Sequence, residues 1–230
     1  MYSKFILYIF VLIFIVSSCK KNNINSPDTD EINSVDYCDL IWTKKNLDVD
    51  HYLNGDAIPE VRDPEEWKNL KTGAWCYYNN DPSLGAIYGK LYNSYAINDP
   101  RGLAPKGWHV VREMEWKLLE NCLGIEQTSL NKLGLRGLDE GGKLKEAGSD
   151  HWMNPNTGAS NTTKLTALPA GRRDENGNFL ELNKCLYWWS YPDGNTTGEI
   201  ARILYYDIAQ IGRDHFDKRS GFSVRCVKDY

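Results

Sequence analysis

The apolar positions of the chain predict three helices. A tryptophan and two leucines recur at i, i+3 and i+7 within residues 113–123, and Gly124 can close this helix. Asp63-Pro64 starts a shorter helix, because aspartate caps well and proline suits the first helical position. The third helix covers residues 139–147. It contains Gly141-Gly142, which has poor helix propensity, so we expect close packing to require these glycines.

The rest of the pattern predicts strands, mostly in the second half of the chain. Asn176-Gly177 lies between residues 165–173 and 179–182, and Asn-Gly is the strongest short hairpin signal. Apolar residues alternate along the last predicted strand, residues 221–227, and so share one face. Helices followed by strands indicate an α+β domain rather than a parallel α/β one. Further strands are expected at residues 40–42, 186–190 and 199–206.

The N-terminal pattern is that of a lipoprotein signal peptide. Residues 5–16 are unbroken apolar, which is too short to span a bilayer comfortably but fits a signal peptide. Val16-Ser17-Ser18-Cys19 then resembles a lipobox. We therefore predict a signal peptide over residues 1–18, lipid on Cys19 with a polar tether to residue 37, and one domain over residues 38–230. The alternative is an ordinary signal peptide with a chance cysteine.

The predicted lipid places the domain at the cell envelope. Several acyl chains on one cysteine anchor firmly, at about 0.8 kcal/mol per buried CH₂. Lys20 rather than aspartate follows Cys19, which is compatible with sorting to the outer membrane. The sequence leaves open whether the domain faces the periplasm or the medium.

Composition narrows the classes of partner. The net charge is −4, so the chain has no broad field that would attract phosphates, and nucleic acid is not an expected partner. The chain contains 8 Trp and 14 Tyr, which suits either a loop-rich core or a surface that stacks on flat ligands. For any single aromatic residue, the core is the commoner place.

The cysteines and histidines do not form a metal-binding pattern. Five cysteines remain after Cys19, an odd number in a compartment that allows disulfides. There is no C-x-x-C, and the four histidines are widely spaced, so we expect no metal and no cofactor. Asp174-x-Asn176-x-Asn178 resembles the start of a calcium loop, but the Asn-Gly hairpin explains it.

Nine segments stand out in order along the chain: IWTKKNL from Ile41, WCYYNND from Trp75, YGKLYNSYAI from Tyr88, RGLAPKGWHV from Arg101, GGKLKEAG from Gly141, NPNTGASN from Asn154, LTALPAGRR from Leu165, YWWS from Tyr187 and GFSVRCV from Gly221. Together they resemble the FISUMP (Fibrobacter succinogenes major paralogous) domain family. This family is typical of lipoproteins from Bacteroidetes-like bacteria, which agrees with the lipobox. The chain departs from the family pattern at Val111-Arg112-Glu113, where the main helix usually begins with Pro-Thr/Ser-Asp.

The resemblance implies a C-type-lectin-like fold with two helices, short paired terminal strands and a long loop region. It also places cysteines at Cys76 and Cys226, so we predict a disulfide between them, which would close most of the domain and contribute about 4–5 kcal/mol. Two alternatives remain open: both are buried free thiols, or Cys122 is the partner of Cys226.

The resemblance to a lectin-like fold does not itself make the domain a lectin. The candidate ligand surface is a loop region in which aromatic faces would stack on sugar rings and polar groups would bridge hydroxyls. The alternative is that the loop bonds to itself and the tryptophans are core, since adjacent strand residues face opposite sides. The candidate residues are Trp152, Asn154, Asn156, Arg172, Trp188, Trp189 and Tyr191.

We therefore expect a non-catalytic binding domain for a glycan or a cell-surface protein. The alternative is a purely structural or adhesive component of the envelope. An enzyme related to the sulfatase-modifying proteins is the least favoured, because those proteins use a close cysteine pair that this chain lacks. Common hydrolase and phosphate-binding motifs are absent as well.

Overall fold

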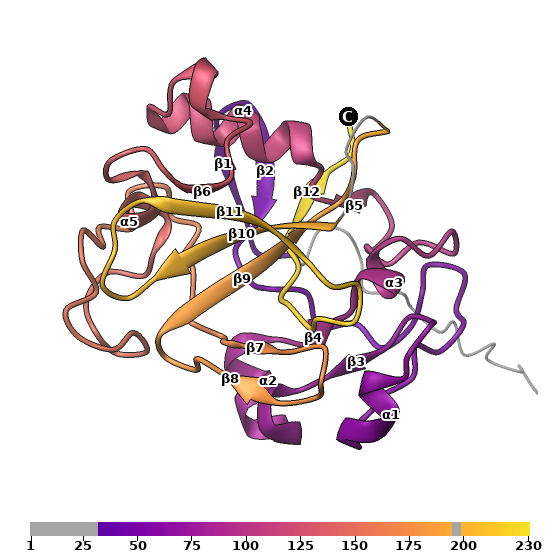
Figure 1. Ribbon diagram of the computed structural model, residues 1–230. Helices are drawn as coiled ribbons and strands as arrows, with labels where there is room; N and C mark the ends of the chain where they lie inside the picture. Colours follow the sequence, from indigo (N-terminus) through magenta and orange to yellow (C-terminus); the bar gives the residue numbers. More distant parts are fainter. Residues whose placement is uncertain (1–31, 195–198) are drawn as a thin grey trace, which may run out of the picture.

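The computed structural model describes residues 32–194 and 199–230. The predicted signal peptide, Cys19 and most of the predicted tether lie outside the described residues. The described part is a mixed α+β structure, as predicted, and its helices and strands are shown in Figure 1. None of the helices in this part is long and apolar enough to cross a membrane.

The helices are short apart from one. The α-helices are α1 (Pro64–Lys68), α2 (Pro82–Tyr88), α3 (Ser94–Ile97), α4 (Glu113–Leu123) and α5 (Glu140–Leu144), with 3₁₀ turns at Tyr78–Asn80 and Gln127–Ser129. The strands are β1 (Ser34–Tyr37), β2 (Leu40–Thr43), β3 (Trp75–Cys76), β4 (Leu91–Tyr92), β5 (Trp108–Val110), β6 (Gly134–Arg136), β7 (Arg172–Arg173), β8 (Phe179–Leu180), β9 (Cys185–Ser190), β10 (Glu199–Tyr205), β11 (Ile211–Phe216) and β12 (Cys226–Lys228).

One sheet joins the two ends of the domain, in the order β1-β2-β12-β5. Val227 of β12 lies opposite Trp42 of β2 in antiparallel pairing, as the predicted closing strands require. The sheet begins earlier than predicted, because Ser34–Tyr37 pair along their whole length with β2. The boundary at residue 38 is therefore wrong, and the last residues assigned to the tether belong to the domain.

A second sheet, in the order β6-β11-β10-β9, crosses the middle of the molecule. In Figure 1, α4 lies on one side of this sheet, while α1, α2 and the two small ribbons β3–β4 and β7–β8 lie at the opposite end. The β7–β8 pair is the predicted hairpin around Asn176-Gly177, with Arg173 opposite Phe179. Asp174 closes its turn by accepting hydrogen bonds from the backbone N–H groups of residues 176 and 178.

Strand β9 lies between the two largest hydrophobic clusters of the domain. All six of its residues are buried. Because successive side chains of a strand point to opposite faces, Trp188 packs in one cluster with Trp42 and Trp116, while Trp189 packs in the other with Phe222. A strand buried on both faces carries no solvent-facing position, so both tryptophans are core residues.

Helix α4 has the predicted boundaries and is held to the second sheet by buried ion pairs. Gly124 follows the helix at a φ of 124°, which favours glycine. Two carboxylates on the inner face of α4 bind three arginines, one from each of β6, β10 and β11. Glu113 contacts Arg202 and Arg213, and Glu120 contacts Arg202 and Arg136. Each of these charges has a partner, which is what makes their burial tolerable.

The Gly141-Gly142 pair of α5 lies where other chain segments approach closely, as the sequence predicts. A Cβ on Gly142 would lie 2.2 Å from the carbonyl oxygen of Gly158, and one on Gly141 would lie 2.4 Å from that of Gln210. Both distances are far below van der Waals contact. The poor helix propensity of these glycines is therefore offset by the packing that they permit.

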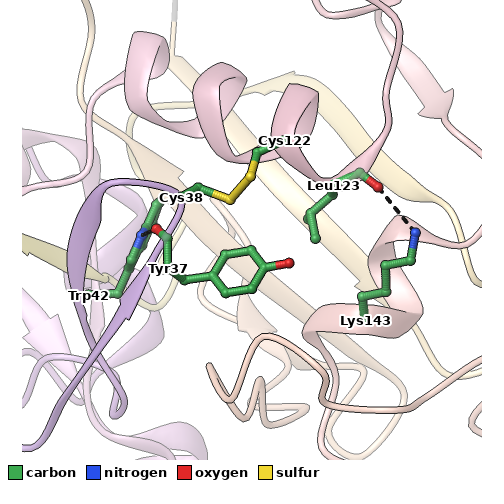
Figure 2. The surroundings of a disulfide bond; sticks show 6 residues. All are labelled: Tyr37, Cys38, Trp42, Cys122, Leu123 and Lys143. Carbon is green, nitrogen blue, oxygen red and sulfur yellow. Dashed lines mark hydrogen bonds between the residues drawn. A yellow bond between two sulfur atoms is a disulfide. The ribbon is translucent and has the colours of Figure 1, made fainter.

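The predicted Cys76–Cys226 disulfide is wrong. Both cysteines are free, and they are buried in different hydrophobic clusters. The disulfide within the described residues joins Cys38 to Cys122, with Cα atoms 6.3 Å apart. Figure 2 shows that it connects the turn between β1 and β2 to the last turn of α4. Next to it, Lys143 of α5 donates a hydrogen bond to the carbonyl of Leu123.

Candidate functional site

Trp152 and Trp189 do not share an exposed surface, so this part of the predicted ligand surface is not present in the structure. The two side chains are 1% and 0% exposed and lie in separate hydrophobic clusters. Each indole N–H is used inside the core: Trp152 donates to the carbonyl of Ala167, and Trp189 donates to that of Tyr92. This part of the prediction is wrong because burial, rather than ligand stacking, accounts for these rings.

Most of the other predicted ligand residues are also engaged within the fold. Trp188 stacks on Trp116 with ring centroids 5.3 Å apart. Asn156 is buried, and its amide donates to two backbone carbonyls of the preceding loop, as the self-bonded alternative requires. Arg172 donates to Glu181 at 2.9 Å. Asn154 is exposed, two residues before Asn156 on the same loop.

Tyr191 is the one predicted aromatic residue that reaches solvent, with 37% of its surface exposed. Its backbone is fixed between β5 and α4, because its N–H donates to Val111 and its carbonyl accepts from Glu113. Tyr191 lines a recess of about 260 Å³ together with Trp108, His109 and Arg112. We call this the small recess.

A larger recess of about 610 Å³ lies along the outer side of α4, and we call it the large recess. Arg112 borders both recesses. Tyr230, which is 94% exposed, contributes a second accessible ring. The volume of the large recess is within the range of small-molecule sites. Its other lining residues combine apolar side chains with amides and charges: Met114, Glu115, Lys117, Leu118, Asn121, Gln127, Leu130, Asn131 and Asp193.

Arg112 differs from every other arginine of the chain. Of the ten arginines, all of which are described, nine donate side-chain hydrogen bonds to carboxylates, carbonyls or amide oxygens. The Arg112 side chain forms no cap hydrogen bond and no ion pair with a described residue. Its backbone N–H, in contrast, is held by Glu115 Oε2 at 2.8 Å. A guanidinium without a protein acceptor therefore lies between the two recesses.

His109, at the border of the small recess, is held by two carboxylates. Its Nε2 lies 2.7 Å from Glu115 Oε1, and its Nδ1 lies 2.7 Å from Asp229 Oδ1. An ionised carboxylate can only accept, so both contacts are hydrogen bonds only when the ring carries both protons. The bond to Glu115 raises the pKa of His109 above its ordinary value of 6.5, and Asp229 adds to this effect. The arrangement therefore stabilises an imidazolium.

Trp108 lines the small recess, but its indole nitrogen does not face it. This N–H is itself buried and has no hydrogen-bond partner among the described residues. Buried polar groups in folded proteins nearly always have partners, so Trp108 is an exception within the core rather than a ligand contact.

The reactive groups elsewhere in the described part are engaged or masked. The thiols of Cys76, Cys185 and Cys226 are buried, which raises the pKa of each to about 12. Burial would raise the pKa of Glu113, but Arg202 and Arg213 outweigh it and lower the pKa to about 2. No group of three metal-ligating side chains occurs within residues 32–194 and 199–230.

One feature of the sequence points to this site. Arg112 lies in the Val111-Arg112-Glu113 segment that departs from the family pattern at the start of the main helix. A cation at the first positions of a helix opposes the helix dipole, so its presence there needs another reason. Tyr230 had no signal, since a terminal residue has no periodicity to place it.

The fold and the two recesses define an α+β domain closed by its terminal strands, with its binding potential concentrated at the start of α4. Residues 35–228 match the family described as the Fibrobacter succinogenes major domain. The match covers most of the chain, and the chain therefore belongs to this family, as the nine segments indicated. No curated protein and no solved structure matches the chain.

Proposed function

We propose that the chain is an outer-membrane lipoprotein anchored through Cys19. The charged N-terminus, the apolar run and the lipobox support this proposal. Because β1 begins at Ser34, residues 20–33 would connect the lipid to the domain, and such a segment reaches at most about 50 Å when extended. A labelled fatty acid should be incorporated into the wild-type protein and not into Cys19→Ser. Label in both proteins would refute the anchor.

We propose that the domain is a non-catalytic binding domain for a glycan, and that the ligand lies in the two recesses on either side of Arg112. The observation that carries this proposal is that an unpaired guanidinium borders two recesses, each of which also has an accessible tyrosine in its lining. Aromatic faces stack on sugar rings, and guanidinium and amide groups bind hydroxyls.

The engagement of the charged groups supports a non-catalytic role. General acid–base catalysis needs a group poised near neutral pH and within reach of a substrate proton. Glu113 and Glu120 are instead buried in ion pairs with arginines, and both oxygens of Glu115 are bound within the protein. His109 is held by two carboxylates. Each of these groups therefore has a structural role.

A glycan array probed with the full-length protein in detergent tests this proposal. We expect specific, saturable binding that Tyr191→Ala weakens. Tyr95→Ala is the matched control, because Tyr95 is a partly exposed tyrosine of α3 that lines neither recess. Equal binding by the two variants would exclude these recesses as the site. If the protein binds no glycan on the array, the proposed glycan binding is refuted.

We also propose that the fold is C-type-lectin-like. The antiparallel pairing of β12 with β2, which joins the terminal strands, supports this assignment. The long loops between α5 and β9 agree with it. An experimental structure of the domain, compared with lectin-like folds, tests the proposal.

A structural or adhesive role is the second candidate, and the edge strand β6 favours it. β6 pairs only with β11, and Leu133, Leu135 and Leu138 in and beside it are exposed. An exposed apolar edge strand can pair with another chain. Chemical cross-linking in intact cells should capture a partner through this strand if the role is structural, and Leu135→Lys should abolish that product.

A further inference from the structure

We propose that the ligand of the two recesses is an anionic saccharide whose carboxylate or sulfate group binds the guanidinium of Arg112. This inference rests on the proposed glycan-binding function and adds the charge class of the ligand. A guanidinium presents a planar fork of donors that matches the paired oxygens of such groups.

The first argument is the contrast with the other arginines. The fold supplies an acceptor to each of the other nine, including the fully buried Arg173, which donates to three backbone carbonyls. Arg112 alone, among the described arginines, has its donors free. Where this domain uses an arginine for structure, it provides the acceptors, so the free donors of Arg112 are available to a ligand.

The second argument is that the position of Arg112 is fixed even though its side chain is free. Its N–H binds Glu115 Oε2, and its backbone forms a parallel bridge with Tyr191. The backbones of Tyr191 and Arg112 therefore keep a constant spacing, although the guanidinium itself is not fixed. A fixed backbone limits the region that the guanidinium can reach to the surroundings of the two recesses.

The third argument concerns the carboxylates near Arg112, which could have competed for it. Glu115 is bound to His109 and to the N–H of Arg112. Asp193 is hydrogen-bonded by the backbone of Met114 at the start of α4. Both carboxylates are thus engaged, and so is Lys117, whose Nζ lies 3.4 Å from Glu113 Oε1. Arg112 is therefore the charged group of this wall that has no partner among the described residues, and an acidic ligand group would supply one.

The fourth argument is the supply of hydroxyl-binding groups on both sides of Arg112. The side chains of Gln127 and Asn131 line the large recess, and the exposed Tyr191 lines the small one. A saccharide that spans Arg112 would place its acidic group at the guanidinium and its hydroxyls at these groups. A fully apolar ligand would leave all of them unsatisfied.

Titration calorimetry with two matched pairs of probes tests the inference. The full-length protein in detergent is titrated with oligogalacturonate and its methyl ester, and with dextran sulfate and dextran. We expect the charged member of at least one pair to bind about tenfold more tightly or better. The pair that shows this preference identifies the group as carboxylate or sulfate. The preference should fall as salt is raised.

Three variants assign the effect to Arg112. Arg112→Ala should remove the preference for the charged probe, and Arg112→Lys should restore part of it, because lysine keeps the charge without the fork. Arg62→Ala, which removes an exposed arginine paired with Glu60 far from both recesses in sequence, should keep the wild-type preference. The unfolding temperatures of all three variants should match the wild type.

Two results would overturn the inference, and only the second would also refute the proposed glycan-binding function. Equal binding of charged and neutral probes, or a preference that persists in Arg112→Ala, refutes the anionic ligand but keeps the proposed glycan-binding function. Absence of binding to every saccharide, together with Arg112-dependent binding of an acidic protein, refutes both.

Discussion

Trp188 and Trp189 are neighbours in β9, yet each is buried in a different hydrophobic cluster of the domain. The strand therefore joins two cores through adjacent residues. We expect Trp188→Ala and Trp189→Ala each to lower the free energy of unfolding by about 3–5 kcal/mol. Tyr191→Ala, one residue beyond the strand, should change it by less than about 1 kcal/mol. Urea unfolding followed by circular dichroism measures all three, and a neutral Trp189→Ala would contradict the buried position.

The Cys38–Cys122 disulfide should be a main contributor to stability. It closes a loop with a sequence separation of 84, for which the chain-entropy model gives about 4–5 kcal/mol. Replacing both cysteines by serine should lower the unfolding free energy by up to this amount. Cys185→Ala, which changes a free thiol, should cost much less. Non-reducing peptide mapping should recover the linked 38 and 122 peptides, and a linked 76 and 226 peptide would refute the pairing.

Glu113 should make the domain sensitive to acid. Its pKa of about 2, below the ordinary 4.5, means that its stabilising effect is complete above pH 4.5 and is lost as the pH falls towards 2. Glu113→Gln should cost about 3–5 kcal/mol at pH 7, because Arg202 and Arg213 lose a buried partner. Glu65→Gln, at the exposed start of α1, is the control. If Glu113→Gln unfolds at the same urea concentration as wild type, the ion pairs contribute nothing.

His109 should have the opposite pH dependence. Its raised pKa means that the folded state holds the proton more tightly than the unfolded chain does. The stabilisation is therefore complete below about pH 6.5 and is lost as the pH rises through the folded-state pKa. The difference in unfolding temperature between wild type and His109→Gln should shrink as the pH rises from 6 to 9. A difference that stays constant between pH 6 and 9 would show that the two carboxylates do not stabilise a charged His109.

Gly142→Ala should destabilise the domain although alanine is the better helix former. Helix propensity alone would favour alanine by about 1 kcal/mol. The added Cβ would meet the Gly158 carbonyl at 2.2 Å, which forces the loop away from α5. Gly194→Ala is the control, because no atom of the described residues lies within 4 Å of a Cβ there. A rise in unfolding temperature for Gly142→Ala would show that the loop around Gly158 can move away from α5 without loss of stability.

The elements that the sequence predicted well are those whose local signals agree with their packing. Helix α4 combines an apolar stripe, acidic residues in its first turn and a closing glycine, and its boundaries were predicted correctly. The Asn-Gly turn likewise produced the β7–β8 hairpin. Helix α2 is not predicted. Its first residues belong to Asn79-Asn80-Asp81-Pro82, which is typical of a turn, yet in the structure Asp81 caps a helix that begins at Pro82.

The elements that were missed depend on distant partners. Strand β11 lacks the alternation of apolar residues that would predict a strand, because an arginine occupies one of its buried positions. Arg213 is tolerated there because it binds Glu113 of α4, a hundred residues earlier in the chain. The candidate site also depends on contacts between residues that are distant in the sequence. Eight tryptophans could not be sorted into core and surface from sequence alone, and Arg112 is distinctive only when the partners of the other arginines are known.

The disulfide also determines how the domain would respond to pulling on its anchor. In a chain held by lipid on Cys19, external force enters the domain at Ser34. Force at that end would peel β1 from β2, because the two strands form a hairpin at the edge of their sheet. The bond at Cys38 stops this unzipping after the four residues of β1 and passes the load to α4. From there the arginine ion pairs distribute it over three strands, so the recesses beside α4 would keep their shape under tension.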